Sequence, residues 1–378
     1  MKIAMFTDSY LPNTDGVVSS ILAFKQGLEK RGHTMYVFAP DADGQAKDPK
    51  VFRYHSVKFP PYPQYRAAVF PYVPADVAKK TGVQVVHSKA MVNMGLSAMN
   101  FASRASLPSV ASLETMIPDG VHYIIKHRGA QQAGKKLAWG YLKWFYSNFD
   151  LVTAPSHHTQ ILMAENGIES IVLPSPVDTN FFKPNGRGEK MKRELGISGK
   201  KVVLAVGRIV EEKNYSLIVK AAAAMRDPGT VFLIVGRGPY LERLKGEIAA
   251  AGLQEKVKVA GFVSGREKLV DIYNAADVFA FASPFETQGL VQLEAMACGT
   301  PACILKDTAP AEAIDEGRNG FTFSDDPKDC AEKLQDCIEK KKKFSLAARK
   351  TVIGKYSVGA LSGKLAHEYE KLIEGRGR

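Results

Sequence analysis

The chain has 378 residues, of which 45% are apolar and 24% are charged, and its 51 Lys and Arg exceed its 39 Asp and Glu. This composition is ordinary for packed globular domains and excludes a mainly disordered, collagen-like or coiled-coil architecture. At about 100–200 residues per domain, the length predicts two domains. The net charge of +12 indicates an anionic partner, which could be nucleic acid, a membrane surface or a phosphorylated substrate.

The cysteines have neither the spacing of metal ligands nor a nearby histidine. We therefore interpret Cys298, Cys303, Cys330 and Cys337 as core residues of a protein in a reducing compartment. An acid at Asp8 interrupts any signal-peptide core, and no apolar run approaches the about 20 residues that span a bilayer. These features predict a cytoplasmic protein, which could lie peripherally at the inner face of the cell membrane.

The first half of the chain begins with a short apolar run at 2–8, which predicts a buried strand. A turn with Pro12 and Gly16 follows, and residues 17–30 carry apolar side chains at helical spacing. A second strand is predicted at 34–39, and the order strand, turn, helix, strand is typical of a parallel sheet. Further strands are predicted at 83–87, 109–112 and 151–154.

The second half repeats this pattern from a predicted strand at 201–206, followed by a Gly207-Arg208 turn and a helix at 215–224. Another strand at 231–235 leads into a glycine-rich turn at 236–239. The remaining predicted elements are a helix at 240–251, strands at 256–260 and 278–282, and a C-terminal helix at 361–372.

Loop-forming residues at 184–190 separate the halves, and we place the domain boundary near 175–200. The predicted domains are residues 1–176 and 177–357, with a C-terminal helix at about 358–378 that packs back on the first. Doubly wound α/β domains bind ligands outside the carboxyl ends of their strands. Two such Rossmann-like domains would face a central cleft.

The most informative segment is 283–301, which follows a predicted strand. Gly289 permits close backbone approach, and the short helix after it offers free N–H groups that suit a phosphate. Glu286 lies just before this helix and Glu294 about one turn inside it, and carboxylates are good acceptors for sugar hydroxyls. The segment indicates a ligand with both phosphate and hydroxyl groups; the alternative is that the two acids merely favour the helix dipole.

Glu286 and Glu294 resemble the Glu-x7-Glu motif of retaining glycosyltransferases, and the residues around them resemble the family's signature. Other similar segments follow in the family's order: Pro155-Ser156, Val177-Asp178, Gly207-Arg208 with Lys213, 236–239, 261–263 and 319–321. The resemblance covers nearly the whole chain. It implies the GT-B fold, glycosyltransferase family 4 and a nucleotide-diphosphate sugar as donor, with diacylglycerol-type lipid glucosyltransferases closest in motif.

The resemblance implies roles for the matching residues. Arg208 and Lys213 would neutralise the donor diphosphate, and the alternative is that they form surface ion pairs. Glu294 would accept the ribose hydroxyls, and Glu286 would bind the sugar hydroxyls. The other residues implied in donor binding are Gly207, Thr287, Gln288, Gly289 and Leu290, together with Phe262 and Val263 near the base.

Gly16 would let the first turn of the chain approach the phosphates, although it could equally be an ordinary turn glycine. The resemblance implies no enzymic nucleophile, no metal and no cofactor. The Asp41-Ala-Asp43 sequence superficially resembles a metal-binding motif, but its polar surroundings favour a solvated turn.

One position departs from the family's pattern. Many members carry a histidine after the strand at 109–112, and here Glu114 stands in its place. A carboxylate could accept a hydrogen bond from a sugar hydroxyl, but it adds negative charge near a diphosphate. The alternative is that the alignment slips by a few residues and His122 is the relevant imidazole.

The stretch from 125 to 146 mixes basic and aromatic residues and resembles that of members that glycosylate diacylglycerol-type lipids. A basic helix with interfacial aromatics fits an element that lies on a membrane surface. The alternative is a long helix whose aromatic side packs on the sheet. The residues concerned are Lys135, Lys136, Trp139, Lys143 and Trp144, with His122 just before them.

The leading hypothesis is a retaining hexosyltransferase that uses UDP- or GDP-hexose and glycosylates a membrane glycerolipid at an anionic membrane surface. The same chemistry on a soluble sugar, sugar phosphate or glycan is the first alternative. A GT-B epimerase or phosphorylase and a non-enzymatic nucleotide-sugar-binding protein are the others. The basic excess divides evenly between the halves and no nucleic-acid-binding motif is present, so no nucleic acid partner is expected.

Overall fold

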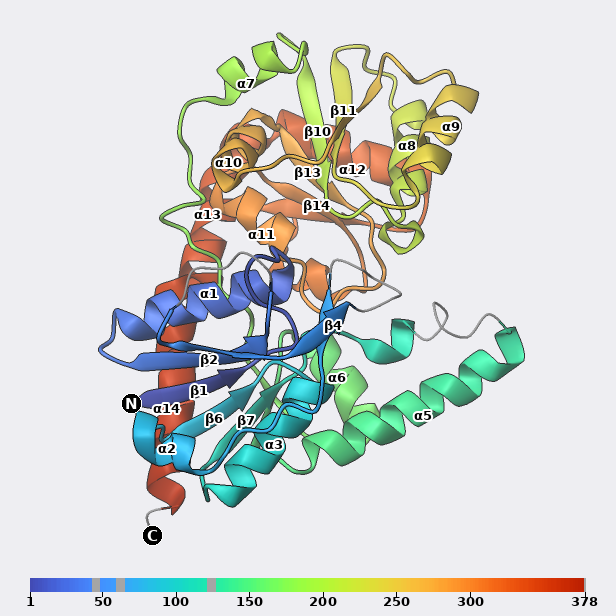
Figure 1. Ribbon diagram of the computed structural model, residues 1–378. Coiled ribbons are helices and arrows are strands. Elements are labelled where there is room, and N and C mark those ends of the chain that lie inside the picture. The colour runs from blue at the N-terminus through green and yellow to red at the C-terminus, as the bar shows by residue number, and fades with distance from the viewer. Residues whose placement is uncertain (43–47, 59–64, 121–126, 377–378) are drawn as a thin grey trace. The chain divides into compact units, whose positions relative to one another are not determined.

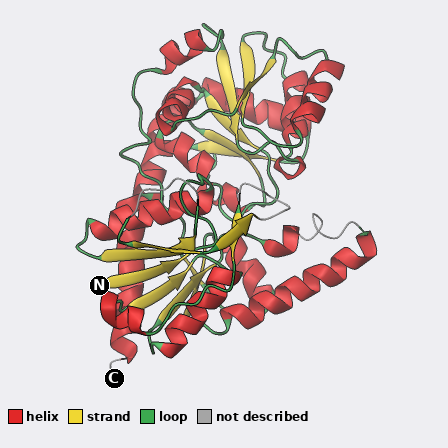
Figure 2. Cartoon of the chain, in the orientation of Figure 1, coloured by secondary structure: helices red, strands yellow, loops and turns green. Residues whose placement is uncertain are grey.

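The computed structural model describes residues 1–42, 48–58, 65–120 and 127–376. They form two compact units, one of Met1–Pro176 with Val358–Arg378 and the other of Val177–Ser357. In each unit, helices cover a parallel sheet (Figures 1 and 2).

Unit 1 is built on a sheet of strand order β3-β2-β1-β6-β7-β8-β9 in the described part of the chain. Its strands are β1 (Lys2–Phe6), β2 (Thr34–Pro40), β3 (Val51–Tyr54), β6 (Val85–Ser88), β7 (Ser109–Ser112), β8 (Leu151–Ala154) and β9 (Ile171–Val172), and β4 (Ser56–Lys58) pairs antiparallel with β5 (Arg66–Ala68). Its helices are α1 (Gly16–Glu29), α2 (Asp76–Thr81), α3 (Asn93–Arg104), η1 (Ile117–Gly120), α5 (Arg128–Tyr146), α6 (His157–Glu165) and α14 (Val358–Arg376).

Strand β1 shows how the sheet of unit 1 divides its core. Ile3 and Met5 pack with α1 and α14, whereas Ala4 and Phe6 pack with α3. Because successive strand residues point to opposite faces, these contacts place α1 and α14 on one face and α3 on the other. All four side chains are fully buried, as expected for a parallel sheet covered on both sides.

The C-terminal helix α14 packs directly on α1 within unit 1. A Cβ atom on Gly27 would lie 2.0 Å from the Ser362 Oγ, so only glycine allows this approach of the two helices. At the centre of the unit, Tyr369 is hydrogen-bonded to Nδ1 of His87, and Nε2 of His87 is hydrogen-bonded to Ser112. Burial, reinforced by the charge of Lys89, holds the pKa of His87 well below its usual range, so the ring stays neutral.

Unit 2 is built on a parallel sheet of order β12-β11-β10-β13-β14-β15. Its strands are β10 (Lys201–Val206), β11 (Thr230–Val235), β12 (Val257–Gly261), β13 (Val278–Phe281), β14 (Ala302–Leu305) and β15 (Gly320–Phe323). Its helices are α7 (Gly188–Glu194), η2 (Glu211–Lys213), α8 (Tyr215–Ala224), α9 (Leu241–Ala250), α10 (Arg266–Ala275), α11 (Leu290–Ala297), η3 (Ala309–Ala313), α12 (Pro327–Glu339) and α13 (Lys341–Tyr356).

The core of unit 2 also lies on both faces of its sheet. Val203 and Ala205 of β10 pack with α8 and α12, and the alternate residues of this strand pack with α10, α11 and α13. All four cysteines are free and buried, as the sequence predicts for core residues. The predicted loop at 184–190 is shorter than expected, because α7 already begins at Gly188.

The strand order reverses once in each sheet. In unit 1 the reversal lies between β1 and β6, and in unit 2 it lies between β10 and β13. At such a point the loops that follow the two strands leave toward opposite faces of the sheet, which opens a crevice at their carboxyl ends. The segments after these four strands are therefore the places to look for a site.

Candidate functional site

The turn after β10 carries the basic residues at the reversal point of unit 2. Its backbone packs tightly against the next turn, since a Cβ on Gly236 would lie 1.9 Å from the carbonyl oxygen of Gly207. The N–H of Ile209 donates to the carbonyl of Arg237 over 2.9 Å. The turn that presents Arg208 is thus held by backbone contacts, and the Arg208 side chain itself is exposed.

Lys213 ends the short helix η2 and points to the loop after β13. Its ammonium forms an ion pair with the Glu286 carboxylate, and both side chains are largely buried. Burial, together with the charge of Arg208, lowers the pKa of Lys213 to about 8. Two segments more than 70 residues apart in the sequence, 208–213 and 283–289, therefore meet through opposite charges.

Glu294 lies inside helix α11, and its partner comes from α10. The hydroxyl of Tyr273 donates to Oε2 of Glu294 over 2.8 Å. Burial raises the pKa of Glu294 to about 7, although the Tyr273 hydrogen bond and the charge of Arg266 act in the opposite direction. Burial and the neighbouring carboxylate raise the pKa of Tyr273 well above its ordinary value, so its hydroxyl remains a donor.

The loop between β13 and α11 ends at Gly289, which adopts a left-handed conformation with φ of +86°. A Cβ there would lie 3.1 Å from Pro310, so glycine suits the position both in conformation and in space. Gln288 is buried, while Thr287 and Leu290 are half-buried. The loop therefore brings a run of backbone N–H groups to the first turn of α11.

Phe262 and Val263 follow β12, at the same carboxyl edge of the sheet. The Phe262 side chain is 54% exposed, and the guanidinium of Arg237 stands 4.4 Å from its ring centroid. Val263 is half-buried against the core. Arg237 belongs to the glycine-rich turn after β11, so this stacked pair lies beside the turn that carries Arg208.

At the reversal point of unit 1, Asp8 follows β1 and accepts hydrogen bonds from the N–H groups of Met91, Val92 and Met94 at the start of α3. Gly16 is exposed and is the first residue of α1, whose N-cap is Asp15. The carboxylate of Asp15 accepts from the N–H of Val18 over 2.9 Å. These contacts fix the starts of α1 and α3 at the carboxyl edge of the sheet.

Glu114 follows β7, and its side chain is mostly buried. It forms an ion pair with Lys89. The sequence raises the concern that Glu114 adds negative charge near a diphosphate. In the structure the ammonium of Lys89 offsets that charge. His122 lies outside the described residues.

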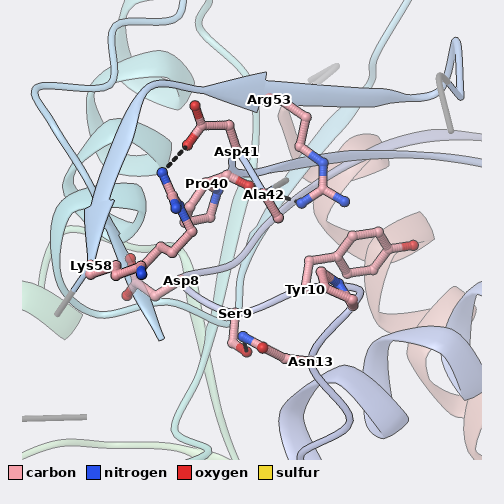
Figure 3. A pocket seen from close by; sticks show the side chains of 11 residues that line it. Asp8, Ser9, Tyr10, Asn13, Pro40, Asp41, Ala42, Arg53 and Lys58 are labelled. Carbon is pink, nitrogen blue, oxygen red and sulfur yellow. Dashed lines mark hydrogen bonds and ion pairs between the residues drawn. The ribbon is translucent and has the colours of Figure 1, made fainter. Parts of the chain in front are cut away.

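A pocket of about 220 Å³ opens at the carboxyl ends of β1 and β2 in unit 1 (Figure 3). The guanidinium of Arg53 donates to the carbonyls of Leu11 and Pro40 and lies 5.3 Å from the Tyr10 ring centroid. Arg66 forms an ion pair with Asp41 over 3.5 Å. The other polar residues around the pocket are Asp8, Ser9, Asn13 and Lys58.

Helix α5 carries the basic and aromatic residues noted in the sequence, and its first turns extend away from the sheet of unit 1 (Figure 1). Lys136 and Lys143 lie with Leu137 and Trp144 on one exposed face. Leu137 is 75% exposed and Trp144 is 50% exposed. The exposed face is thus both basic and apolar.

The other aromatic residues of α5 take a different position. Phe145 and Tyr146 are buried in the core. Trp139, which the sequence groups with the interfacial residues, packs half-buried against the same core cluster. Its i+2 spacing from Leu137 turns it away from the exposed face. Lys135 is exposed and precedes that face by one residue.

Two family models match the chain. The one described as Glycosyltransferase Family 4 matches residues 14–181, and the one described as Glycosyl transferases group 1 matches residues 187–351. An alpha-monoglucosyldiacylglycerol synthase of Streptococcus pneumoniae is 32% identical over 313 residues, which cover 80% of this chain and 70% of that protein. This chain is a family 4 glycosyltransferase.

Other relatives of this glycosyltransferase differ in the sugar that their names state. An alpha-monoglucosyldiacylglycerol synthase of Acholeplasma laidlawii is 30% identical, with 86% of this chain and 85% of that protein covered. A GDP-mannose-dependent alpha-mannosyltransferase of Mycobacterium tuberculosis is 27% identical over 100% of this chain and 98% of its own. The glycosyltransferase therefore transfers a sugar from a nucleotide sugar, and its relatives leave the sugar open.

Solved structures agree on the fold of this glycosyltransferase. Sucrose-phosphate synthase from Thermosynechococcus elongatus matches with a TM-score of 0.77 and 18% identity, over 99% of both chains. Anabaena Alr3699/HepE in complex with UDP-glucose matches with a TM-score of 0.73 and 19% identity, over 98% of this chain and 100% of that one. The fold is GT-B, as the sequence motifs imply.

The sequence did not indicate Tyr273, although this residue donates a hydrogen bond to the Glu294 carboxylate. It lies in an ordinary helical pattern, where a tyrosine carries no signal of a functional contact. Lys89 was also missed, because nothing near it in the sequence marks it as the partner of Glu114. Among the described residues, no group of three His, Cys, Asp or Glu side chains lies close enough to hold a metal ion.

Replacing Tyr273 by Phe should raise the pKa of Glu294 further above its ordinary value. The variant keeps the packing of the ring and removes only the hydroxyl that stabilises the carboxylate. A hydrogen bond to a charged group contributes about 1.5–3 kcal/mol, so we expect a rise of about 1–2 pH units. Titration of the Glu294 carboxyl carbon by NMR, assigned with Glu294→Gln, measures it.

The matched control is Tyr240→Phe, because Tyr240 donates to Glu247 in the same unit. This variant should leave the titration of Glu294 unchanged. An unaltered Glu294 titration in Tyr273→Phe would contradict the assignment of Tyr273 as its donor.

Proposed function

We propose that this glycosyltransferase is a retaining hexosyltransferase that takes a hexose from UDP- or GDP-hexose and attaches it to a hydroxyl of a membrane glycerolipid. The observation that carries the donor half is the meeting of Lys213 with Glu286 at the reversal point of the unit 2 sheet. A cation for a diphosphate and a carboxylate for sugar hydroxyls stand side by side there. The names of the two relatives at 30% identity or more support the lipid acceptor.

In this proposal the donor lies over the carboxyl edge of unit 2. Arg208 and Lys213 neutralise the diphosphate, and Glu286 accepts from hydroxyls of the hexose. Glu294 accepts from the ribose hydroxyls and is held by Tyr273. Backbone groups of Gly207, Thr287, Gln288, Gly289 and Leu290 line the phosphates and sugar, and Phe262 and Val263 meet the base. Gly16 is assigned to the phosphates as a residue of the first turn of the chain.

The Lys213–Glu286 ion pair has a consequence for donor binding. In the donor-free protein each group satisfies the other, so neither charge stays unpaired in its largely buried position. A diphosphate offers Lys213 a stronger partner and the sugar hydroxyls offer Glu286 new donors. Donor binding then exchanges one set of polar contacts for another, so that both Lys213 and Glu286 have a polar partner before and after the donor binds.

The chemical step needs no enzymic nucleophile in this proposal. The acceptor oxygen attacks the anomeric carbon from the face on which the diphosphate leaves, so the C–O bond to the acceptor forms as the C–O bond to the phosphate breaks. The acceptor proton passes to the departing phosphate oxygen. Arg208 and Lys213 stabilise the negative charge that develops there, and Glu114 accepts a hydrogen bond from a hydroxyl of the transferred sugar.

The proposed acceptor surface is the exposed face of α5. Lys135, Lys136 and Lys143 would attract anionic lipid headgroups, and Leu137 and Trp144 would enter the interface. Among the described residues no helix is long and apolar enough to cross a membrane. A peripheral position at the inner face of the cell membrane follows from these roles.

A phosphate-bearing soluble acceptor is the second candidate, and the pocket of Figure 3 favours it. Three basic residues, Arg53, Lys58 and Arg66, line that pocket and outnumber its two acids, Asp8 and Asp41. Among the relatives, a mannosylfructose-phosphate synthase of Agrobacterium fabrum is 30% identical over 61% of this chain. The experiment below separates the two acceptors.

The test crosses UDP- and GDP-hexoses with diacylglycerol in vesicles, soluble sugars, sugar phosphates and no acceptor, with products identified by mass spectrometry and their anomeric form by NMR. We expect a hexosyl glycerolipid with the anomeric configuration of the donor. Lys213→Ala should lower kcat/KM by about 10²–10³, as expected for loss of a charge that stabilises a leaving group. Glu286→Gln should impair use of the donor more than binding to lipid vesicles.

The matched control is Lys245→Ala, which removes a lysine of an exposed ion pair in the same unit and should leave the rate unchanged. Donor turnover without acceptor, beyond slow hydrolysis, would instead indicate an epimerase, and a glycosylated sugar phosphate would indicate the soluble acceptor. Wild-type rates in Lys213→Ala and Glu286→Gln would remove both residues from the donor site.

The pH dependence should reflect two groups of the donor site. Glu294 must be ionised to accept from the ribose, so kcat/KM for the donor should fall below its pKa of about 7. Lys213 must be protonated to bind the diphosphate, so kcat/KM should also fall above its pKa of about 8. We expect a maximum between these values, measured with saturating acceptor. A profile that is flat from pH 6 to 9 would contradict both roles.

Membrane binding should depend on the exposed face of α5. Changing Lys135, Lys136 and Lys143 to Gln should weaken sedimentation with anionic vesicles by about 1 kcal/mol for each lysine. Leu137→Ser with Trp144→Ser should weaken it as well, because both side chains would leave the interface. The same charge loss at the exposed residues Lys328, Lys342 and Lys343 is the control. Equal binding of all these variants would exclude the α5 surface.

A further inference from the structure

A buried ion pair lies at the carboxyl edge of the unit 1 sheet, beside the point where the strand order reverses. Lys89 directly follows β6, and Glu114 comes two residues after β7. Their side chains are 2% and 10% exposed, and the Lys89 ammonium contacts Oε1 of Glu114. Such burial of two charges is costly unless both are paired and hydrogen-bonded.

Two serines complete a closed ring of polar contacts with this pair. Nζ of Lys89 also donates to Oγ of Ser20 in α1 over 2.8 Å, and the hydroxyl of Ser175 donates to Oε2 of Glu114 over 3.2 Å. The two serine hydroxyls are 2.6 Å apart. Since the hydrogen of Ser175 goes to Glu114, Ser20 is the donor between the serines. The ring therefore fixes both oxygens of Glu114.

Fold stability alone does not account for a charged pair in this place. Well-packed apolar residues of similar volume usually stabilise a protein as well as a buried ion pair does, or better. The ring joins α1, the ends of β6 and β7 and the segment after β9, at the edge where doubly wound sheets bind ligands. The Glu114 side chain also keeps some exposure, whereas the Lys89 side chain is almost fully buried.

We propose that Lys89 is a positioning residue for sugar transfer, which orients the Glu114 carboxylate so that it accepts a hydrogen bond from a hydroxyl of the transferred sugar. This inference rests on the proposed function of the glycosyltransferase. Lys89 does not touch substrate and acts through Glu114. Its charge also cancels that of Glu114, so the carboxylate contributes hydrogen-bonding capacity without repelling a diphosphate.

Two other titratable groups bear on the pair. His87, from β6, has a pKa held well below its usual range by burial and by Lys89. Tyr146, from α5, has a pKa raised by burial and by the charge of Glu114. Neither group changes its charge between pH 6 and 9, so a pH effect in that interval that follows the Lys89 substitution reports on Glu114.

The test compares kcat/KM of Lys89→Met with that of the wild type across pH 6–9. Removing the ammonium leaves a buried carboxylate without its opposite charge, which favours the protonated form, a poorer acceptor. We expect kcat/KM to be about tenfold lower or more at pH 7, the cost of one hydrogen bond to a charged group. The ratio of variant to wild type should rise with pH as the carboxylate forms again, and Lys89→Arg should restore the wild-type rate.

The matched control is Lys192→Met, which breaks another buried pair, Lys192 with Asp277, at the amino end of the unit 2 sheet. It should lower the melting temperature and leave the pH profile of the active enzyme unchanged. If the ratio of kcat/KM between Lys89→Met and the wild type does not change with pH, whatever its value, the inference is overturned. A purely structural lysine would behave in that way.

The double variant Lys89→Met with Glu114→Gln removes both charges and serves as the test should Lys89→Met not fold. It should transfer slowly at every pH, and wild-type transfer would overturn the inference. If Lys213→Ala abolishes transfer while the Lys89 variants behave as the wild type, this inference alone fails. If Lys213→Ala and Glu286→Gln also transfer normally, the proposed donor site fails with it.

Discussion

The parallel order of the strands, with one reversal in each sheet, constrains where polar side chains can gather in this glycosyltransferase. Parallel strands buried on both faces leave little place for charges along their length, so the charges collect where the strands end. In unit 2 the reversal brings the turn with Lys213 and the loop with Glu286 together. In unit 1 it brings Asp8 and Lys89 to neighbouring strand ends.

Both units then meet the same electrostatic requirement in the same way. A lysine after one strand is neutralised by a glutamate after another, which keeps buried charges paired before any substrate arrives. The surroundings differ: Ser20 and Ser175 contact the pair of unit 1, whereas the exposed Arg208 lies near the pair of unit 2. In the proposed roles, Lys89 orients Glu114, whereas Lys213 exchanges Glu286 for the donor diphosphate.

Much of this arrangement could be predicted from the sequence, because short apolar runs, glycine turns and the Glu-x7-Glu spacing are local signals. The strands β3, β4, β5, β9, β14 and β15 were not predicted, since each is short and none has a distinct alternation. Tyr273 and Lys89 act on glutamates that are 21 and 25 residues away along the chain. Such contacts depend on how α10 packs on α11 and how β6 pairs with β7, which no local pattern contains.

The exposed face of α5 is a second case in which the local sequence pattern predicts the helix but not the contacts of its side chains. The composition predicts a basic and aromatic helix. The position of each aromatic residue around the helix axis decides whether its side chain enters the core. Trp144 stays outside and Trp139 turns inward because they lie five residues apart, on different faces of the helix. The sequence predicts the helix, but only the packing of unit 1 decides which of its residues are buried and which are exposed.

The path of the chain through unit 1 has a consequence for synthesis. Helix α14 contacts α1 at Gly27 and reaches the centre of the sheet through Tyr369, yet it is made after all of unit 2. As the chain leaves the ribosome, the first 176 residues lack a helix that covers one face of their sheet, whereas unit 2 already has all its elements. The unit that begins first is therefore completed last, and until then one apolar face of its sheet lacks the cover of α14.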